Sequence, residues 1–215
     1  MKNFILKHFT TISSMRKILE SGFRLSDGSR WEDQNDKFAL DLYQKHFPYA
    51  RVLCFCQTDA TIYHWQYYGK LNTEKHTCER IAEEKIGCFI GLDAEKFDKY
   101  VKSLGYIFEP VQYMYMNELK KAQITIDNVL LIKRKGFKVD DEKRIICNNE
   151  KNEKEVFIPN VIEFVKKIVI SGAVPYSQFL EIKESIQNTY PKIEVRRSRL
   201  ADSEEWRAIL YTNFK

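Results

Sequence analysis

The chain of 215 residues is poor in the two residues that interrupt regular structure, with 8 glycines and 5 prolines. This composition excludes the collagen-like class and the Pro/Gly-rich disordered class. No stretch approaches the roughly 20 consecutive apolar residues that a membrane-spanning helix needs. The first residues do not resemble a signal peptide either. We therefore expect a soluble, cytoplasmic protein that does not enter a membrane.

Motifs for metal binding are also missing. The chain has five cysteines, an odd number, and no C-x-x-C pair. His64, His76 and Cys78 would supply zinc ligands only if the fold assembled them. We expect reduced, mostly buried thiols and no metal site.

Glycine-rich motifs that hold phosphates are absent as well. Neither G-x-G-x-x-G nor G-x-x-x-x-G-K-[ST] occurs, and there is no G-x-S-x-G elbow. The sequence therefore gives no motif in favour of a kinase, a P-loop protein or an α/β-hydrolase.

What the chain does contain is enough apolar material for a sizeable core. Apolar residues make up 44% and aromatic residues 13% of the sequence. The net charge is +5, with basic clusters at 133–135, 166–167 and 196–199. Such clusters are usually solvated faces, although a polyanionic partner or a dinucleotide stays open. Strand and helix patterns interleave without a regular βαβ rhythm, which favours one mixed α+β domain over residues 1–215.

The patterns predict the following elements. Strands are expected at 4–10, 23–26, 51–57, 85–93, 106–116 and 137–146, and two more at 192–197 and 206–212. Helices are expected from Ser13 or Ser14 to Gly22, from Asn35 or Asp36 onward, and over 62–70 behind Asp59 or Thr61. Further helices are expected from the cap Asp93 to Gly105, over 127–135 and over 176–188.

Three groups of residues are candidates for chemistry. His8 and Thr10 share one face of the first strand, where an imidazole can donate a hydrogen bond to a ribose hydroxyl. Tyr67 and Tyr68 belong to an aromatic stretch, and a tyrosine at a pocket rim can stack on a flat heterocycle. For both groups a plain core role is the competing interpretation.

The third group is the stretch FKVDDEKRII, residues 137–146. In a strand, Asp140, Glu142 and Arg144 fall on one face. Two carboxylates and a guanidinium are costly to bury unless they pair with each other or with a ligand. A charge ladder at a sheet edge is the alternative.

Short motifs in a fixed order resemble a family of bacterial proteins. They are HFTT at 8–11, ILESG and FRLS at 18–26, CFC at 54–56, HWQYYG at 64–69 and IGCFIGL at 86–92, followed by Phe137, Asp140, Glu142 and Arg144. The family is the bacterial domain of unknown function numbered twenty-nine seventy-one. Its acidic N-D-P-x-E element is present only loosely, at 31–37, without the proline. The resemblance covers residues 4–146, and we expect 155–215 to belong to the same domain.

More distantly, the layout resembles the ADP-ribosyltransferase superfamily. That likeness implies mostly antiparallel sheets flanked by helices around a central cleft that holds NAD as substrate. It also implies a role for each candidate. Glu142 would stabilise the oxocarbenium-like charge, Asp140 would orient or deprotonate the acceptor, and His8 with Thr10 would hold the adenosine ribose. Tyr67 or Tyr68 would stack on nicotinamide, and Arg144 would pair with a carboxylate or meet a phosphate.

The resemblance therefore implies a toxin or antiphage-defence effector that transfers ADP-ribose to nucleic acid or protein, with a neutralising partner. One alternative is a metal-dependent nuclease in which Asp140 and Glu142 bind Mg²⁺ beside Lys133 or Lys143. Another is a non-catalytic binding module. The enzymatic interpretation requires His8 and the carboxylates near residue 140 to meet at a single crevice.

Overall fold

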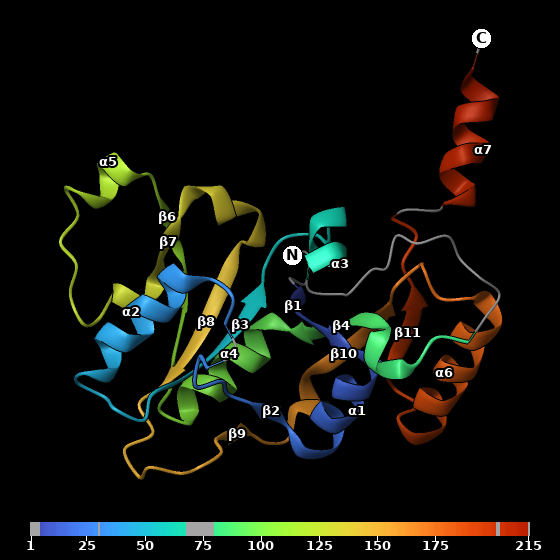
Figure 1. The fold of residues 1–215 in the computed structure, drawn as a ribbon. Coiled ribbons are helices and arrows are strands. Elements are labelled where there is room, and N and C mark those ends of the chain that lie inside the picture. Colours follow the sequence, from blue (N-terminus) through green and yellow to red (C-terminus); the bar gives the residue numbers. More distant parts are fainter. Residues whose placement is uncertain (1–4, 30, 68–79, 201–202, 215) are drawn as a thin grey trace. The chain divides into compact units, whose positions relative to one another are not determined.

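The computed structural model describes residues 5–29, 31–67, 80–200 and 203–214 (Figure 1). The chain divides into two compact units. The first unit comprises residues 1–8, 17–58 and 92–164, and the second comprises 9–16, 59–91 and 165–215. The division passes through the first strand and the first helix.

The first unit contains an antiparallel sheet in the order β1-β3-β8-β5. Its strands are β1 (Ile5–Thr11), β3 (Arg51–Cys56), β8 (Glu142–Cys147) and β5 (Ile107–Pro110). Two short pairs accompany it: β2 (Phe23–Arg24) with β9 (Phe157–Ile158), antiparallel, and β6 (Gln112–Met114) with β7 (Ile132–Arg134), parallel. The predicted α+β class with mostly antiparallel sheet is confirmed.

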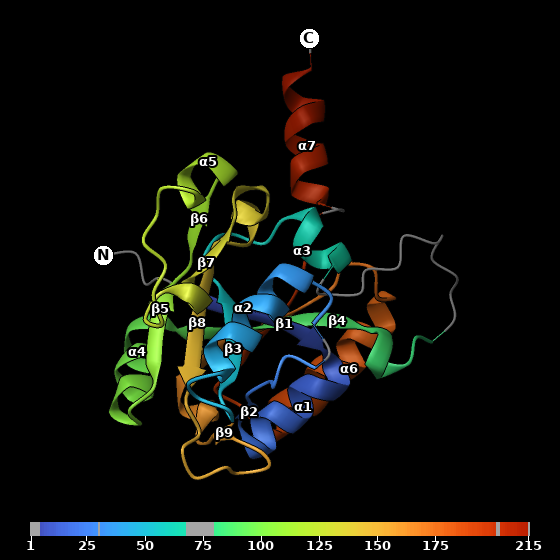
Figure 2. The ribbon, with the colours of Figure 1, turned by 60° about the vertical axis from the view of Figure 1, so that its left-hand side comes forward.

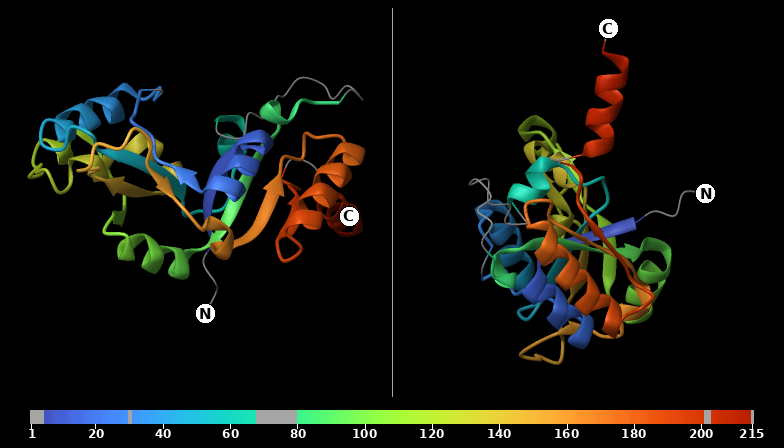
Figure 3. Two further views of the ribbon diagram at one scale, coloured as in Figure 1. Left: turned by 90° about the horizontal axis from the view of Figure 1, so that it is seen from below. Right: turned by 90° about the vertical axis from the view of Figure 1, so that its right-hand side faces the viewer.

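Helices lie on both faces of this sheet (Figure 3). Helix α2 (Gln34–Gln44) is on one face and α4 (Ala94–Ser103) on the other. Each begins behind an aspartate whose carboxylate accepts backbone N–H groups of the first turn, Asp33 for α2 and Asp93 for α4. The shorter helices are α5 (Met116–Leu119) and the 3₁₀ turns η2 (Val129–Leu131), η3 (Lys135–Asp140) and η4 (Val161–Phe164).

The two faces of the sheet pack differently. On the α4 face, the rings of Phe23, Phe55, Phe97 and Phe108 contact one another with centroids 5.3 to 6.0 Å apart. On the α2 face the buried apolar residues are Leu40, Tyr43, Ala50, Val52, Val129, Leu130 and Ile146. The α2 face is the one that also carries buried charge.

The second unit, seen with the first in Figure 2, contains strands in the order β11-β10-β4. These are β11 (Glu194–Arg197), β10 (Val165–Ile170) and β4 (Gly87–Asp93), whose last two residues belong to the first unit. Strands β10 and β11 run parallel. Its helices are α3 (Ile62–Tyr67), α6 (Tyr176–Thr189), α7 (Glu204–Asn213), the turn η1 (Glu83–Lys85) and the start of α1 (Ile12–Ser21). Within the described ranges, no helix has the length and apolar character required to cross a bilayer.

Three sequence predictions of local structure are wrong. Residues 127–135 form η2 and then β7 instead of a helix, because Val129 and Leu130 are buried against α2. Residues 206–212 form helix α7 behind the cap Ser203 instead of a strand. Residues 137–140 belong to η3, and Asp141 adopts a left-handed conformation (φ 42°) before β8 begins at Glu142.

Candidate functional site

Five charged side chains meet on the α2 face of the first unit, and we call them the charge cluster: Asp36, Lys133, Asp140, Glu142 and Arg144. They come from α2, β7, the end of η3 and β8. No side chain of the five is more than 11% exposed. The surface charge ladder considered from the sequence is therefore not what this stretch forms.

Arg144 links strand β8 to helix α2 through hydrogen bonds of its guanidinium group. Its Nε donates to Glu142 Oε2 at 2.8 Å, and its Nη2 donates to Asp36 Oδ2 at 2.8 Å. Its Nη1 donates to the carbonyl of Leu130 at 2.9 Å. Glu142 and Arg144 lie on one face of β8, as the alternation of the strand predicts. The guanidinium thus has an acceptor at each of its three nitrogens.

Lys133 pairs with all three carboxylates of the charge cluster. Its Nζ lies 2.5 Å from Glu142 Oε1, 3.1 Å from Asp140 Oδ2 and 3.5 Å from Asp36 Oδ2. The ammonium also lies 4.7 Å from the centre of the Phe137 ring. Three carboxylates therefore surround one ammonium group.

The ion pairs fix the charge state of the cluster. Burial opposes the ionised form of Glu142, but the charges of Arg144 and Lys133 outweigh it and hold the pKa of Glu142 below its usual value. Burial likewise opposes the charge of Lys133, yet its carboxylate partners raise the pKa of Lys133 well above that of a free lysine. The pKa of Arg144 is raised in the same way. Near neutral pH these three groups stay ionised.

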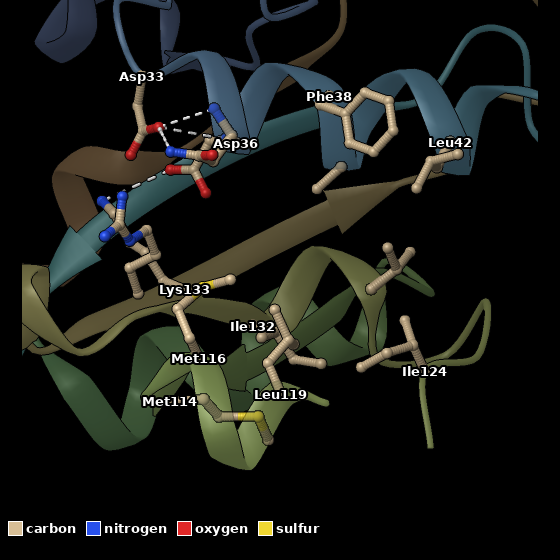
Figure 4. Close-up of a pocket in the computed structure, with 14 residues that line it drawn as sticks. Asp33, Asp36, Phe38, Leu42, Met114, Met116, Leu119, Ile124, Ile132 and Lys133 are labelled. Carbon is tan, nitrogen blue, oxygen red and sulfur yellow. Dashed lines mark hydrogen bonds and ion pairs between the residues drawn. The ribbon is translucent and has the colours of Figure 1, made fainter. Parts of the chain in front are cut away.

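An open cavity of about 380 Å³ begins beside the charge cluster (Figure 4). Asp33, Asp36 and Lys133 lie at one end, and Phe38, Leu42 and Ile124 extend toward the other. The remaining lining is mostly apolar: Ala39, Met114, Met116, Leu119, Val129 and Ile132, with Asn35 and Arg134. Phe38 and Met116 are 63% and 56% exposed, so apolar surface continues to the rim.

His8 lies on the other face of the same sheet. The register pairs Lys7 with Cys56 and Cys56 with Glu142, so Lys7 and Glu142 share a face and His8 points away from it. The imidazole ring contacts the rings of Phe23 and Phe55 at 5.0 and 5.6 Å, and Nδ1 is 3.2 Å from the Cys54 carbonyl oxygen. Burial lowers the pKa of His8 to about 4, despite that hydrogen bond. The structure does not bring His8 together with Asp140 and Glu142.

The other predicted binding residues belong to the second unit or fall outside the described residues. Thr10 is half-buried in the part of β1 that belongs to the second unit. Tyr67 is in α3 of the second unit, 49% exposed, with its ring stacked on Tyr63 at 5.7 Å. Tyr68 lies outside the described residues, as do His76 and Cys78, two of the three possible zinc ligands named from the sequence. Of the predicted site residues that the structure describes, Asp140, Glu142 and Arg144 are brought together in the first unit.

Sequence reasoning missed the helix side of the site. Asp36 accepts from Arg144 across 108 residues of chain, and no local pattern indicates that pairing. Asp33, which caps α2, was not identified from the sequence, because the predicted helix began at Asn35 or Asp36. Lys133 was considered only as a partner of metal-bound carboxylates. Within the described ranges, no group of His, Cys, Asp and Glu side chains is arranged to hold a metal ion.

Comparison with known proteins does not identify a family for the chain. The chain matches no family model and no curated protein. The family and the activity that the sequence motifs imply therefore stay predictions.

Proposed function

We propose that the first unit binds a small molecule in the cavity between α2 and the segment 114–134. The observation that carries this proposal is the cavity itself, with apolar walls that end at the charge cluster. Ligand sites in proteins typically have volumes of about 300–1,000 Å³, mostly apolar linings and a few fixed polar groups. A volume of about 380 Å³ falls at the small end of that range.

The charge states favour binding over acid–base catalysis. A general acid or base works best with a pKa near the working pH. Glu142 has a lowered pKa, and Lys133 and Arg144 have raised ones, so none of the three is poised to exchange a proton near neutral pH. This supports a role for the cluster as a rigid polar wall that orients a ligand.

The transfer of ADP-ribose from NAD stays a prediction of the sequence motifs. It assigned His8 and Glu142 to one crevice, and their positions on opposite faces of the sheet give it no support. Incubation with NAD distinguishes the two proposals. Binding alone leaves NAD intact, whereas release of nicotinamide that stops in Glu142→Gln would overturn a purely binding role.

The test of the binding proposal uses the methionine methyl groups as reporters. Met114 and Met116 line the cavity, whereas Met15 is fully buried in α1 and does not line it. With ¹³C-methyl methionine, titration of 4-phenylbutan-1-ol is expected to shift the Met114 and Met116 signals saturably and to leave Met15 unchanged. Shifts confined to Met15, or no saturable shift, would contradict the proposal.

Variants that fill the cavity provide the control. Ala39→Phe places a ring in the cavity from α2, and Ile124→Trp does so from a residue that is 44% exposed and tolerates a larger side chain. Both are expected to remove the titration. Ile107→Trp, at a 37% exposed isoleucine of β5 outside the cavity, is expected to leave it intact. Unchanged binding in both filled variants would place the ligand elsewhere.

A further inference from the structure

The polar end of the cavity contains carboxylate oxygens that lack donors. Asp36 is 8% exposed and uses its Oδ2 for both Arg144 and Lys133. Its second oxygen, Oδ1, accepts no hydrogen bond from any residue within the described ranges. Asp33 uses Oδ1 to cap α2, and in the same part of the chain its buried Oδ2 has no hydrogen-bond partner. Leaving the buried Asp33 Oδ2 without a donor is costly. Asp36 Oδ1 keeps some exposure, so a ligand in the cavity can supply a donor to it.

The net charge at the polar end of the cavity indicates which charge the ligand carries. Four carboxylates belong to it, those of Asp33 and of the three acidic members of the charge cluster. The cations are Lys133 and Arg144, together with Arg134 on the cavity wall. Lys133 and Arg144 are already engaged by carboxylates, and with Arg134 included the four carboxylates still exceed the three cations by one. The excess of negative charge favours a positively charged donor.

The rest of the lining sets the shape of the ligand. Phe38, Leu42 and Ile124 continue the cavity away from Asp33 and Asp36 (Figure 4). A ligand held at the carboxylates by a cationic group must therefore carry an apolar body to fill the remaining space. Met114 and Met116 have unbranched side chains that adapt to such a body.

From these observations we infer that the cavity takes a hydrophobic amine, with a protonated amino group at Asp36 and Asp33 and an apolar chain or ring between α2 and the segment 114–134. This inference rests on the proposed function and names the ligand class of that same site. A carboxylic acid of the same shape is disfavoured by the excess of carboxylates at the polar end, and an alcohol lacks the charge that the site favours.

Three probes that differ only in the polar group test the inference: 4-phenylbutylamine, 4-phenylbutan-1-ol and 4-phenylbutyrate. At pH 7 the amine is protonated, since its pKa is close to that of lysine. Titrations followed through the Met114 and Met116 methyl signals are expected to give an amine affinity about tenfold or more above that of the alcohol. The butyrate is expected to bind more weakly than the alcohol.

A matched pair of variants assigns the preference to the site. Asp33→Asn removes the charge but keeps the helix cap, because asparagine caps as well as aspartate. It is expected to reduce the preference for the amine over the alcohol several-fold. Asp93→Asn makes the same change at the cap of α4, outside the cavity, and is expected to leave the preference unchanged.

The outcomes of these titrations distinguish the amine assignment from the proposed binding function. Equal affinities for amine and alcohol, or tighter binding of the butyrate, would overturn the amine assignment and leave the binding function standing. A preference for the amine that is the same in Asp33→Asn and the wild type would also overturn it. Failure of all three probes to shift Met114 and Met116 would refute the binding function together with the inference.

Discussion

Replacement of Arg144 by methionine tests whether the charge cluster stabilises the first unit. The guanidinium is 1% exposed and serves Glu142, Asp36 and the Leu130 carbonyl at 2.8 to 2.9 Å. Arg144→Met fills similar space but leaves two carboxylates with only Lys133 to neutralise them. Breaking a buried ion pair by removing one partner costs about 3–5 kcal/mol. We expect a loss of that size in the free energy of unfolding at pH 7, a large part of the roughly 5–15 kcal/mol of a typical domain.

The assay is urea unfolding. For Arg144→Met we expect a lower urea midpoint and an unchanged slope of the free energy of unfolding against urea concentration. The double variant Glu142→Gln/Arg144→Met removes one of the stranded charges, so its loss is expected to be at least about 1 kcal/mol smaller than the sum of the single losses. Lys143→Met is the matched control on the same strand. Lys143 points to the other face, where it pairs with Asp98 and both side chains are partly accessible, so its removal costs no more than about 1 kcal/mol. An Arg144→Met loss no larger than that of Lys143→Met would refute the reasoning.

Two other predictions concern the sheet and its turns. The pKa of His8 is about 4 in the folded protein against 6.5 for an ordinary histidine. The unfolded chain therefore takes up the proton first as the pH falls, and stability is lost below about pH 6.5. Between pH 7.5 and 5 the loss is at most about 2 kcal/mol, and urea midpoints of wild type and His8→Leu measure it; parallel pH profiles would contradict it. Gly22 has φ +93°, and an added Cβ would lie 2.1 Å from the Ile158 carbonyl oxygen, so Gly22→Ala is expected to lower the free energy of unfolding by more than about 1 kcal/mol. Gly105→Ala also has a positive φ but meets no atom within 4 Å, and the two variants losing equal stability would argue against the close approach at Gly22.

Part of this site was predictable from the sequence because it depends on local alternation. Glu142 and Arg144 are two residues apart in a strand, and that spacing places them on one face wherever the strand pairs. The Asp33 cap follows equally from local chemistry, since helix α2 needs an acceptor at its first turn. These features survive any tertiary arrangement that keeps the strand and the helix.

The rest depended on register and on distant contacts. The face that His8 occupies is set by the pairing of Lys7 with Cys56, and a shift of one residue would reverse it. The pairing of Asp36 with Arg144, which are separated by 108 residues in the sequence, joins α2 to β8. The cavity requires α2 and the segment 114–134 to stand apart at one end while Val129 packs against the core, and no periodicity in either segment encodes that separation.

The most direct test of the account is the dissociation constant of 4-phenylbutylamine for the wild type and for Ile124→Trp, read from the Met114 and Met116 methyl resonances at pH 7. A ligand held in the cavity by its apolar body and by the Asp36 end must lose saturable binding in the variant. Equal constants for the two proteins, or resonances that never move, would contradict the assignment of the cavity as a binding site.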